Sequence, residues 1–487
     1  MERAAHCPPN FLVISSNEHR KDTLGCAGHP LVHNPHLDKL AARGTRFTNA
    51  YTSSPMCVPT RAALACGDHV HRTGFWDGAT PYDGSAATWM HRVRDAGHEM
   101  VSIGKLHFRS GEDDNGFIEE ILPMHVVAGV GWMAALLRED PPAYDAAVEV
   151  AAESGPGSSS YTDYDLAITA TATDWMAERR NAERPWAAFV PLVSPHFPLR
   201  APQKFCTRYA DADFDLQPQQ LPDHPEICNL VFFFDYERHF TAEARHAAMA
   251  DYFHLTSFFD DCVGQILATL EESGQAKDTV ILYLSEHSEL LGDKGIWTKQ
   301  VIYKASAGIP MILAGPGVPP VGTVRSSAAE LVDVAATALD VMLETLDDSA
   351  PGLSLRRLAQ DPKDADRTAL SEFHDGRSTP GAFMIRFGDW KYVCYPGMPP
   401  QLFNLAEEPS EDHDLGSDIS QRAAAARAES ASRVPTICNA DAVNRKCFAD
   451  QAAWIEALGG IDVCRNAHLF NHTPTPAEQA AMREDGR

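Results

Sequence analysis

Short apolar runs alternate with longer stretches of helical periodicity along most of the chain. An apolar run of strand length predicts a buried strand, and apolar residues repeating at helical spacing predict a helix. The predicted strands are residues 11–14, 100–103, 186–193, 280–284 and 310–313, and the predicted helices are residues 35–43, 242–272 and 328–343. Strands that are apolar throughout have to be covered on both faces. The pattern therefore predicts an α/β fold in which helices sandwich a large mixed sheet.

The pattern changes near residue 361. Two segments with strand-like alternation, residues 382–387 and 391–395, are separated by Gly388-Asp389 and predict an antiparallel hairpin. The Ala-rich residues 421–432 predict a helix. These features are typical of a smaller α+β unit.

We therefore predict a large α/β domain at residues 1–360 and an α+β subdomain at residues 361–487. The segment 202–225 is rich in Pro and Asp, and we expect it to form a surface excursion. Residues from 467 on are expected to form an irregular terminal arm.

The net charge limits the possible partners, and the cysteines and the N-terminal residues bear on the compartment. The formal net charge is −26 at pH 7, so the summed field repels nucleic acid and an anionic membrane surface, and we expect neither as a partner. The 11 cysteines have no regular spacing, which argues against a disulfide framework. The N-terminal residues lack the pattern of a signal peptide, so we expect a cytoplasmic protein.

Polar residues follow four of the predicted strands at the point where each strand ends. In open α/β sheets, functional groups gather beyond the carboxyl ends of the strands. One such cluster could consist of ordinary polar loop residues, whereas four such clusters favour a common site. The residues are Asn17, Glu18 and His19; Lys105 and His107; His196; and Glu286, His287 and Glu289.

A further candidate is Cys57, which opens the pentapeptide Cys-Val-Pro-Thr-Arg ahead of an Ala-rich run that predicts a helix. A thiol at a helix N-terminus lies where unpaired N–H groups and the helix dipole favour an anion, and Arg61 adds a positive charge one turn away. Such a motif also arises by chance, and an ordinary buried cysteine is the alternative interpretation.

Taken together, the motifs resemble those of the sulfatase branch of the alkaline-phosphatase superfamily, which includes arylsulfatases and phosphonate monoester hydrolases. The resemblance covers nearly the whole chain, and the matching segments are residues 57–61, 104–107, 194–198, 286–287 with 291–299, 309–312 with 314–317, 389–392 and 402–405. It implies an alkaline-phosphatase-like fold and metal-dependent hydrolysis of aryl or alkyl sulfate monoesters. Side activity toward phosphonate and phosphate esters is expected of such sites.

By this resemblance, a formylglycine-generating enzyme oxidises Cys57 to formylglycine. The aldehyde hydrate then supplies a hydroxyl nucleophile that is bound to a divalent cation, usually Ca²⁺. Attack on sulfur expels the alcohol or phenol and leaves a covalent sulfate ester. The second hydroxyl of the hydrate allows this ester to collapse without attack of water on sulfur.

The resemblance also assigns roles to five other side chains. Arg61 would hold the hydrate, and His107 would act as its base. Lys105 and Lys299 would bind sulfate oxygens, and His196 would protonate or stabilise the leaving oxygen. The alternative interpretation of each is ordinary: a loop lysine is often a solvated charge, and a histidine before Phe-Pro can be a packing residue.

The metal ligands implied by the resemblance are Asn17, Glu18, Cys57, Glu286 and His287, and this set departs from the family's usual carboxylates. Asn17 removes one negative charge, and Glu286 has a longer side chain than the usual aspartate. His287 offers nitrogen, which suits Mn²⁺ or another transition metal better than Ca²⁺. The resemblance implies Ca²⁺, and the ligand set leaves Mn²⁺ or another cation open.

Two functions remain open at this point. The first is an active sulfatase, and Lys105 with His107 favours it over a phosphonate monoester hydrolase. The second is a catalytically impaired relative that binds a sulfated or other anionic ligand, because Asn17 and Glu286 alter the metal site. Different chemistry on the same scaffold is a third possibility, for which no particular residue argues.

The late segment, residues 453–470, has more apolar side chains than a solvated arm needs: Trp454, Ile455, Leu458, Ile461, Leu469 and Phe470. It could dock on a neighbouring subunit or fold back on its own chain. Because the resemblance includes family members with intersubunit C-terminal arms, we expect a homo-oligomer.

Overall fold

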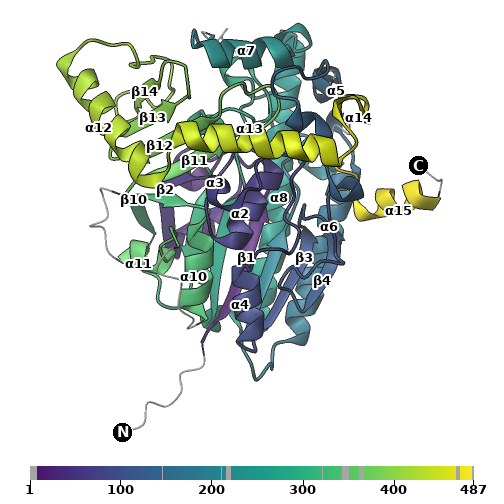
Figure 1. Ribbon diagram of the computed structural model, residues 1–487. Helices are drawn as coiled ribbons and strands as arrows, with labels where there is room; N and C mark the ends of the chain where they lie inside the picture. The colour runs from purple at the N-terminus through teal and green to yellow at the C-terminus, as the bar shows by residue number, and fades with distance from the viewer. Residues whose placement is uncertain are drawn as a thin grey trace.

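The computed structural model describes residues 8–144, 146–209, 211–214, 221–320, 322–342, 350–360, 367–467 and 472–484. A mixed sheet with the strand order β10-β2-β9-β8-β1-β6-β3-β4 forms its centre (Figure 1). β9 runs antiparallel to β2 and β8, whereas the other neighbouring strands are parallel. The predicted α/β architecture is confirmed.

The strands of this sheet include every strand predicted from apolar runs. They are β1 (Asn10–Ser16), β2 (Gly44–Tyr51), β3 (Glu99–Lys105), β4 (Glu119–Met124), β6 (Trp186–Pro191), β8 (Thr279–Ser285), β9 (Met311–Ala314) and β10 (Thr323–Glu330). Val13 of β1 pairs with Phe189 of β6 and Leu282 of β8. Leu12 and Ile14 belong to one hydrophobic cluster and Phe11 and Val13 to another, so β1 is buried on both faces.

Helices cover both faces of the sheet (Figure 1). The helices of one face are α1 (Pro35–Ala42), α6 (Ser160–Glu178) and α8 (Ala242–Glu272), and those of the other are α2 (Cys57–Cys66), α4 (Trp89–Asp95) and α10 (Asp333–Val341). The connections contain α3 (Val70–Thr73), α5 (Ala146–Ala152), α7 (Pro225–Phe234), α9 (Lys304–Ala307), α11 (Leu355–Gln360) and the parallel pair β5 (Ser154–Pro156) and β7 (Leu199–Ala201). None of the described helices is long and apolar enough to span a bilayer.

The C-terminal region adds a second, antiparallel sheet. It consists of β11 (Ala369–Phe373), β12 (Ala382–Phe387), β13 (Trp390–Cys394) and β14 (Gln401–Asn404). The predicted hairpin is confirmed, because Phe387 pairs with Trp390 across the Gly388-Asp389 turn. The predicted domain boundary at residue 361 lies outside the described residues.

In the part of the C-terminal region that the structure describes, this sheet is followed by the helices α12 (Gln421–Ile437), α13 (Ala440–Ala457), α14 (Ile461–Asn466) and α15 (Pro476–Glu484). In Figure 1, α13 crosses the molecule beside α2 and α3, and Cys447 of α13 packs with Ala63 of α2. Trp454, Ile455 and Leu458 pack against Leu136 and Leu137 of the same chain, so this part of the late segment folds back. Leu469 and Phe470 lie outside the described residues.

Two expectations about local structure are wrong in part. The predicted helix 328–343 begins only at Asp333, because residues 323–330 form the edge strand β10 that pairs with β2; residue 343 is outside the described part. The terminal arm is not irregular throughout, since α15 forms from Pro476. The Thr475 hydroxyl and the Glu478 carboxylate bond reciprocally to the backbone at its start, as in a capping box. Of the predicted surface excursion, residues 210 and 215–220 lie outside the described part.

Candidate active site

The predicted site residues meet at one edge of the central sheet. β1, β3, β6 and β8 are parallel, so their carboxyl ends lie at the same edge. Asn17 and Glu18 follow β1, Lys105 ends β3, and Glu286 follows β8. Contacts between side chains of these segments, described below, show that the loops converge.

Cys57 is the first residue of α2 and is buried. Its Sγ lies 3.1 Å from Nε2 of His287 and 3.9 Å from Oδ1 of Asn17. Burial raises the pKa of the Cys57 thiol, and the negative charge of Glu286 adds to the rise. Burial of the side chain thus disfavours the thiolate form of an unmodified Cys57.

The same residues could hold a divalent cation. Ligand atoms of Cys57, Glu286 and His287 all lie within 4.8 Å of one another, and these side chains are buried. Neither carboxylate oxygen of Glu286 accepts a hydrogen bond within the described chain, although Arg61 lies against one of them as an ion pair. Buried acceptors normally have partners, so the two carboxylate oxygens of Glu286, next to the thiol of Cys57 and the ring of His287, fit a bound cation.

Glu18 lies apart from this group. Its Oε1 forms an ion pair with Nζ of Lys299 and is 3.3 Å from Nε2 of His196. Of the residues expected to bind the metal, the structure thus brings Asn17, Cys57, Glu286 and His287 together, whereas Glu18 pairs with Lys299.

Arg61, Lys105 and His107 bring further polar side chains into electrostatic contact with this group. Arg61 donates from Nη1 to the carbonyl oxygen of Lys105. Nζ of Lys105 and both ring nitrogens of His107 have no hydrogen-bond partner in the described part of the chain. Burial lowers the pKa of Lys105, and burial together with Lys105 lowers the pKa of His107 far below its usual value. These unpartnered buried donors are placed to receive an anion.

Lys299 and His196 form a second pair at the site. Burial opposes the charge of Lys299, but Cys57 and Glu18 beside it raise the pKa of Lys299 above its ordinary value. Burial and Lys299 hold the pKa of His196 far below its ordinary value, so the ring is neutral. Its Nδ1 lies 2.5 Å from the Phe197 carbonyl, which fixes the proton on Nδ1. Nε2 then accepts a hydrogen bond from Lys299 at 3.0 Å.

A cavity of about 310 Å³ opens above Cys57. Glu18, His107, His196 and Lys299 reach it. Its wall also includes residues that the sequence did not single out, among them Trp132, Tyr144, Tyr161, Glu149, His472 and Thr473. The Tyr161 hydroxyl donates to the Thr473 carbonyl at 2.8 Å, so the C-terminal arm closes one side of the cavity.

Asp165 of α6 is a supporting residue that the sequence did not reveal. Its carboxylate accepts hydrogen bonds from the backbone N–H groups of Val193 and Ser194, both at 2.7 Å. Burial raises the pKa of Asp165 to about 6. These bonds fix the start of the loop that carries His196. A single aspartate within a helical segment gives no signal of this role.

The fold and the residues gathered at the site are those of a hydrolase of the alkaline-phosphatase superfamily. The sulfatase family model matches residues 9–344, and the chain belongs to the sulfatase family. It is therefore a sulfuric ester hydrolase, and members of this family typically use a metal and formylglycine.

Two curated relatives agree with this assignment, and a solved structure shares the fold. A choline-sulfatase of Rhizobium meliloti (strain 1021) is 30% identical over 426 residues, which is 84% of this chain and 83% of that protein. The arylsulfatase K of Danio rerio is 27% identical over 444 residues, or 85% of this chain and 82% of that protein. A phosphonate monoester hydrolase of Silicibacter pomeroyi shares the fold, with a TM-score of 0.72 and 24% identity over 89% of this chain and 96% of its own.

Proposed function

We propose that the protein hydrolyses a small alkyl or aryl sulfate monoester, with formylglycine derived from Cys57 as the nucleophile. The observation that carries the proposal is the position of Cys57 at a buried helix N-terminus, beside the candidate metal ligands and within electrostatic reach of Lys105, whose Nζ has no partner among the described residues.

The proposed reaction depends on two groups that the chain would acquire, a divalent cation and formylglycine. A divalent cation held by Asn17, Glu286, His287 and residue 57 would lower the pKa of the nucleophile. Formylglycine would supply, as a hydrate, one hydroxyl for attack and a second that allows sulfate to leave. Ca²⁺ is the family expectation, and the nitrogen of His287 makes Mn²⁺ the main alternative.

The remaining side chains act on substrate and protons. Lys105 supplies a buried donor for the sulfate oxygens. Its Nζ has no other partner among the described residues, so it can bind sulfate without breaking an existing hydrogen bond. His107 is neutral and can accept a proton from the hydrate. The raised pKa of Lys299 keeps its ammonium charged beside Nε2 of His196, so it can donate a hydrogen bond to the leaving oxygen as negative charge develops there.

The cavity favours a compact alcohol or phenol. Its volume of about 310 Å³ and its aromatic wall of Trp132, Tyr144, Tyr161 and Phe197 suit a group the size of a small alkyl chain or one ring. The similarity to a choline-sulfatase supports an alkyl sulfate. A cytoplasmic location and a homo-oligomeric state remain predictions.

Turnover assays test the proposed function. Protein co-expressed with a formylglycine-generating enzyme is supplied with Ca²⁺ or Mn²⁺ and assayed with choline sulfate, an aryl sulfate and phenyl phosphonate. We expect turnover of at least one sulfate ester with a higher kcat/KM than that of the phosphonate, and loss of turnover after treatment with a chelator. If no ester is hydrolysed while a sulfated ligand still binds, the protein is the catalytically impaired, anion-binding relative instead.

A further inference from the structure

Lys299 follows a loop that closes on itself. After β8 and the Glu286–His287 pair, the chain turns back at residues 290–298. Leu290 N donates to the Thr298 carbonyl at 2.8 Å, and Gly292 N donates to the Ile296 carbonyl at 3.1 Å. The position of Nζ of Lys299 between Glu18 and His196 therefore depends on the shape of this loop.

Glu289 joins the two ends of the loop. Its buried side chain places one oxygen, Oε1, 2.9 Å from the N–H of Leu291 and 2.5 Å from the N–H of Thr298. We propose that Glu289 is a positioning residue: by binding both ends of the loop with one oxygen, it sets the place of Lys299 in the active site. This inference rests on the catalytic use of Lys299 in the proposed function.

The backbone of the loop needs such support. Leu291 and Thr298, the residues whose N–H groups Glu289 binds, have φ values of 53° and 66°. Non-glycine residues adopt this left-handed region at a cost, and they keep it only where the surroundings hold them there. Without an acceptor at Oε1, both N–H groups would be buried and unpaired, and the loop would relax.

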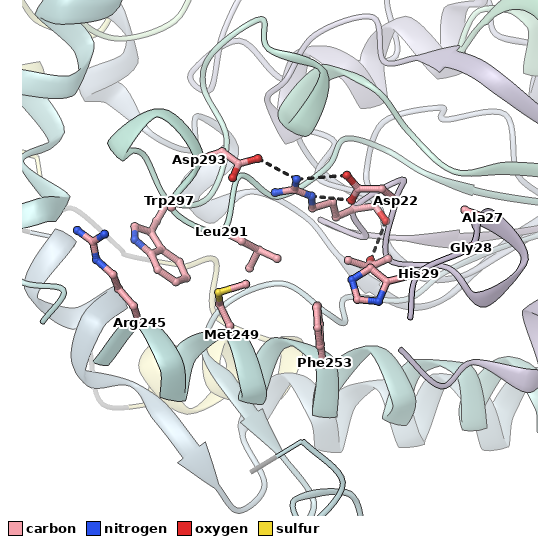
Figure 2. Close-up of a pocket in the computed structure, with 13 residues that line it drawn as sticks. Asp22, Ala27, Gly28, His29, Arg245, Met249, Phe253, Leu291, Asp293 and Trp297 are labelled. Carbon is pink, nitrogen blue, oxygen red and sulfur yellow. Dashed lines mark hydrogen bonds and ion pairs between the residues drawn. The ribbon is translucent and has the colours of Figure 1, made fainter. Parts of the chain in front are cut away.

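The outer side of the loop is tied to the segment that carries Glu18. Figure 2 shows Leu291, Asp293 and Trp297 of the loop facing a second cavity, of about 340 Å³. There, Nη2 of Arg20 lies 2.8 Å from Oδ2 of Asp293, and Nη1 of Arg20 donates to the Leu290 carbonyl at 2.8 Å. Arg20 thus fixes the outer part of the loop, and Glu289 fixes the end next to Lys299.

Because Glu289 accepts both hydrogen bonds with one oxygen, suitable variants can distinguish its positioning role from a role of its negative charge. An amide oxygen can accept the same two bonds, so Glu289→Gln keeps the loop closed. Glu289→Asp keeps the charge but withdraws the oxygen from both N–H groups, and Glu289→Met keeps the volume but has no oxygen. A metal ligand or a general base at this position would show the opposite order, with Asp more active than Gln.

Kinetics and amide exchange of these three variants test the inference. We expect E289Q to stay near the wild-type kcat, and E289D and E289M to lose about 100-fold in kcat with a smaller change in KM, as expected for a catalytic group displaced by about 1 Å. Their metal content should equal that of the wild type. A kcat for E289D above that of E289Q, or loss of metal in E289Q, would overturn the inference.

Hydrogen exchange supplies a readout that does not need activity. The peptide containing residues 290–299 should exchange faster in E289D and E289M than in the wild type, and at the wild-type rate in E289Q. If E289M fails to fold, the comparison of E289D with E289Q decides the result. If the wild type hydrolyses no sulfate ester, the proposed function fails, whereas unchanged exchange in E289D would refute the role of Glu289 itself.

Discussion

Cys57→Ala is expected to lower turnover of a sulfate ester by about 10⁴-fold or more, because it removes the group that forms the bond to sulfur. Cys57→Ser should also be severely impaired, since a plain serine has no second hydroxyl through which sulfate can leave. The measurement is kcat/KM for the best sulfate ester of the wild type, with each variant loaded with the same cation.

A matched control lies on the same helix. Cys66, the last residue of α2, lies at the opposite end of the helix from Cys57. Cys66→Ala should retain wild-type kcat/KM, which excludes a general effect of losing a thiol from α2. A Cys57→Ala protein with substantial turnover would show that another residue attacks the ester.

The second large effect is expected at Lys299. Lys299→Met removes the partner of both Glu18 and His196, and it leaves the Glu18 carboxylate buried without the positive side chain that pairs with it. We expect kcat to fall by about 100- to 1,000-fold because the leaving oxygen loses its donor. The free energy of unfolding should fall by about 3–5 kcal/mol, the usual cost of breaking a buried ion pair by removing one partner.

A double variant separates the two effects. Glu18→Gln combined with Lys299→Met removes both charges of the pair, so we expect it to recover a large part of the lost stability, as measured by denaturant unfolding. It should not recover kcat, because the donor to the leaving oxygen is still absent. Recovery of activity in the double variant would mean that Lys299 acts only by neutralising Glu18.

The sequence predicted those parts of the fold in which one local pattern dominates. The bounds of α8 match the predicted helix to the residue, and β1 and β8 contain the predicted apolar runs. β2 has the sequence Gly-Thr-Arg-Phe-Thr-Asn-Ala-Tyr, whose polar residues hide it from a search for apolar runs. β10 ends in Ala-rich sequence that also suits a helix, and its pairing with β2 decides the outcome.

The same contrast holds for the active site. Cys57, Lys105, His107 and His196 stand in short motifs that are recognisable in the amino-acid sequence alone. The pairing of Glu18 with Lys299 cannot be recognised in the sequence, because these residues are 281 positions apart and either could have had another partner. Asp165 acts on the backbone of Val193 and Ser194 from a helix without a motif, and His472 reaches the cavity from the distant C-terminal arm. Glu289 stands beside the recognisable Glu286-His287 pair, but its bonds to backbone N–H groups leave no signal in the sequence.

The most direct test of the account is the mass of the peptide that contains residue 57, taken from protein produced together with a formylglycine-generating enzyme. We expect active protein to carry an aldehyde at this position, detectable as a loss of mass relative to cysteine and by reaction with a hydrazine. Active protein in which residue 57 is entirely unmodified cysteine would contradict it.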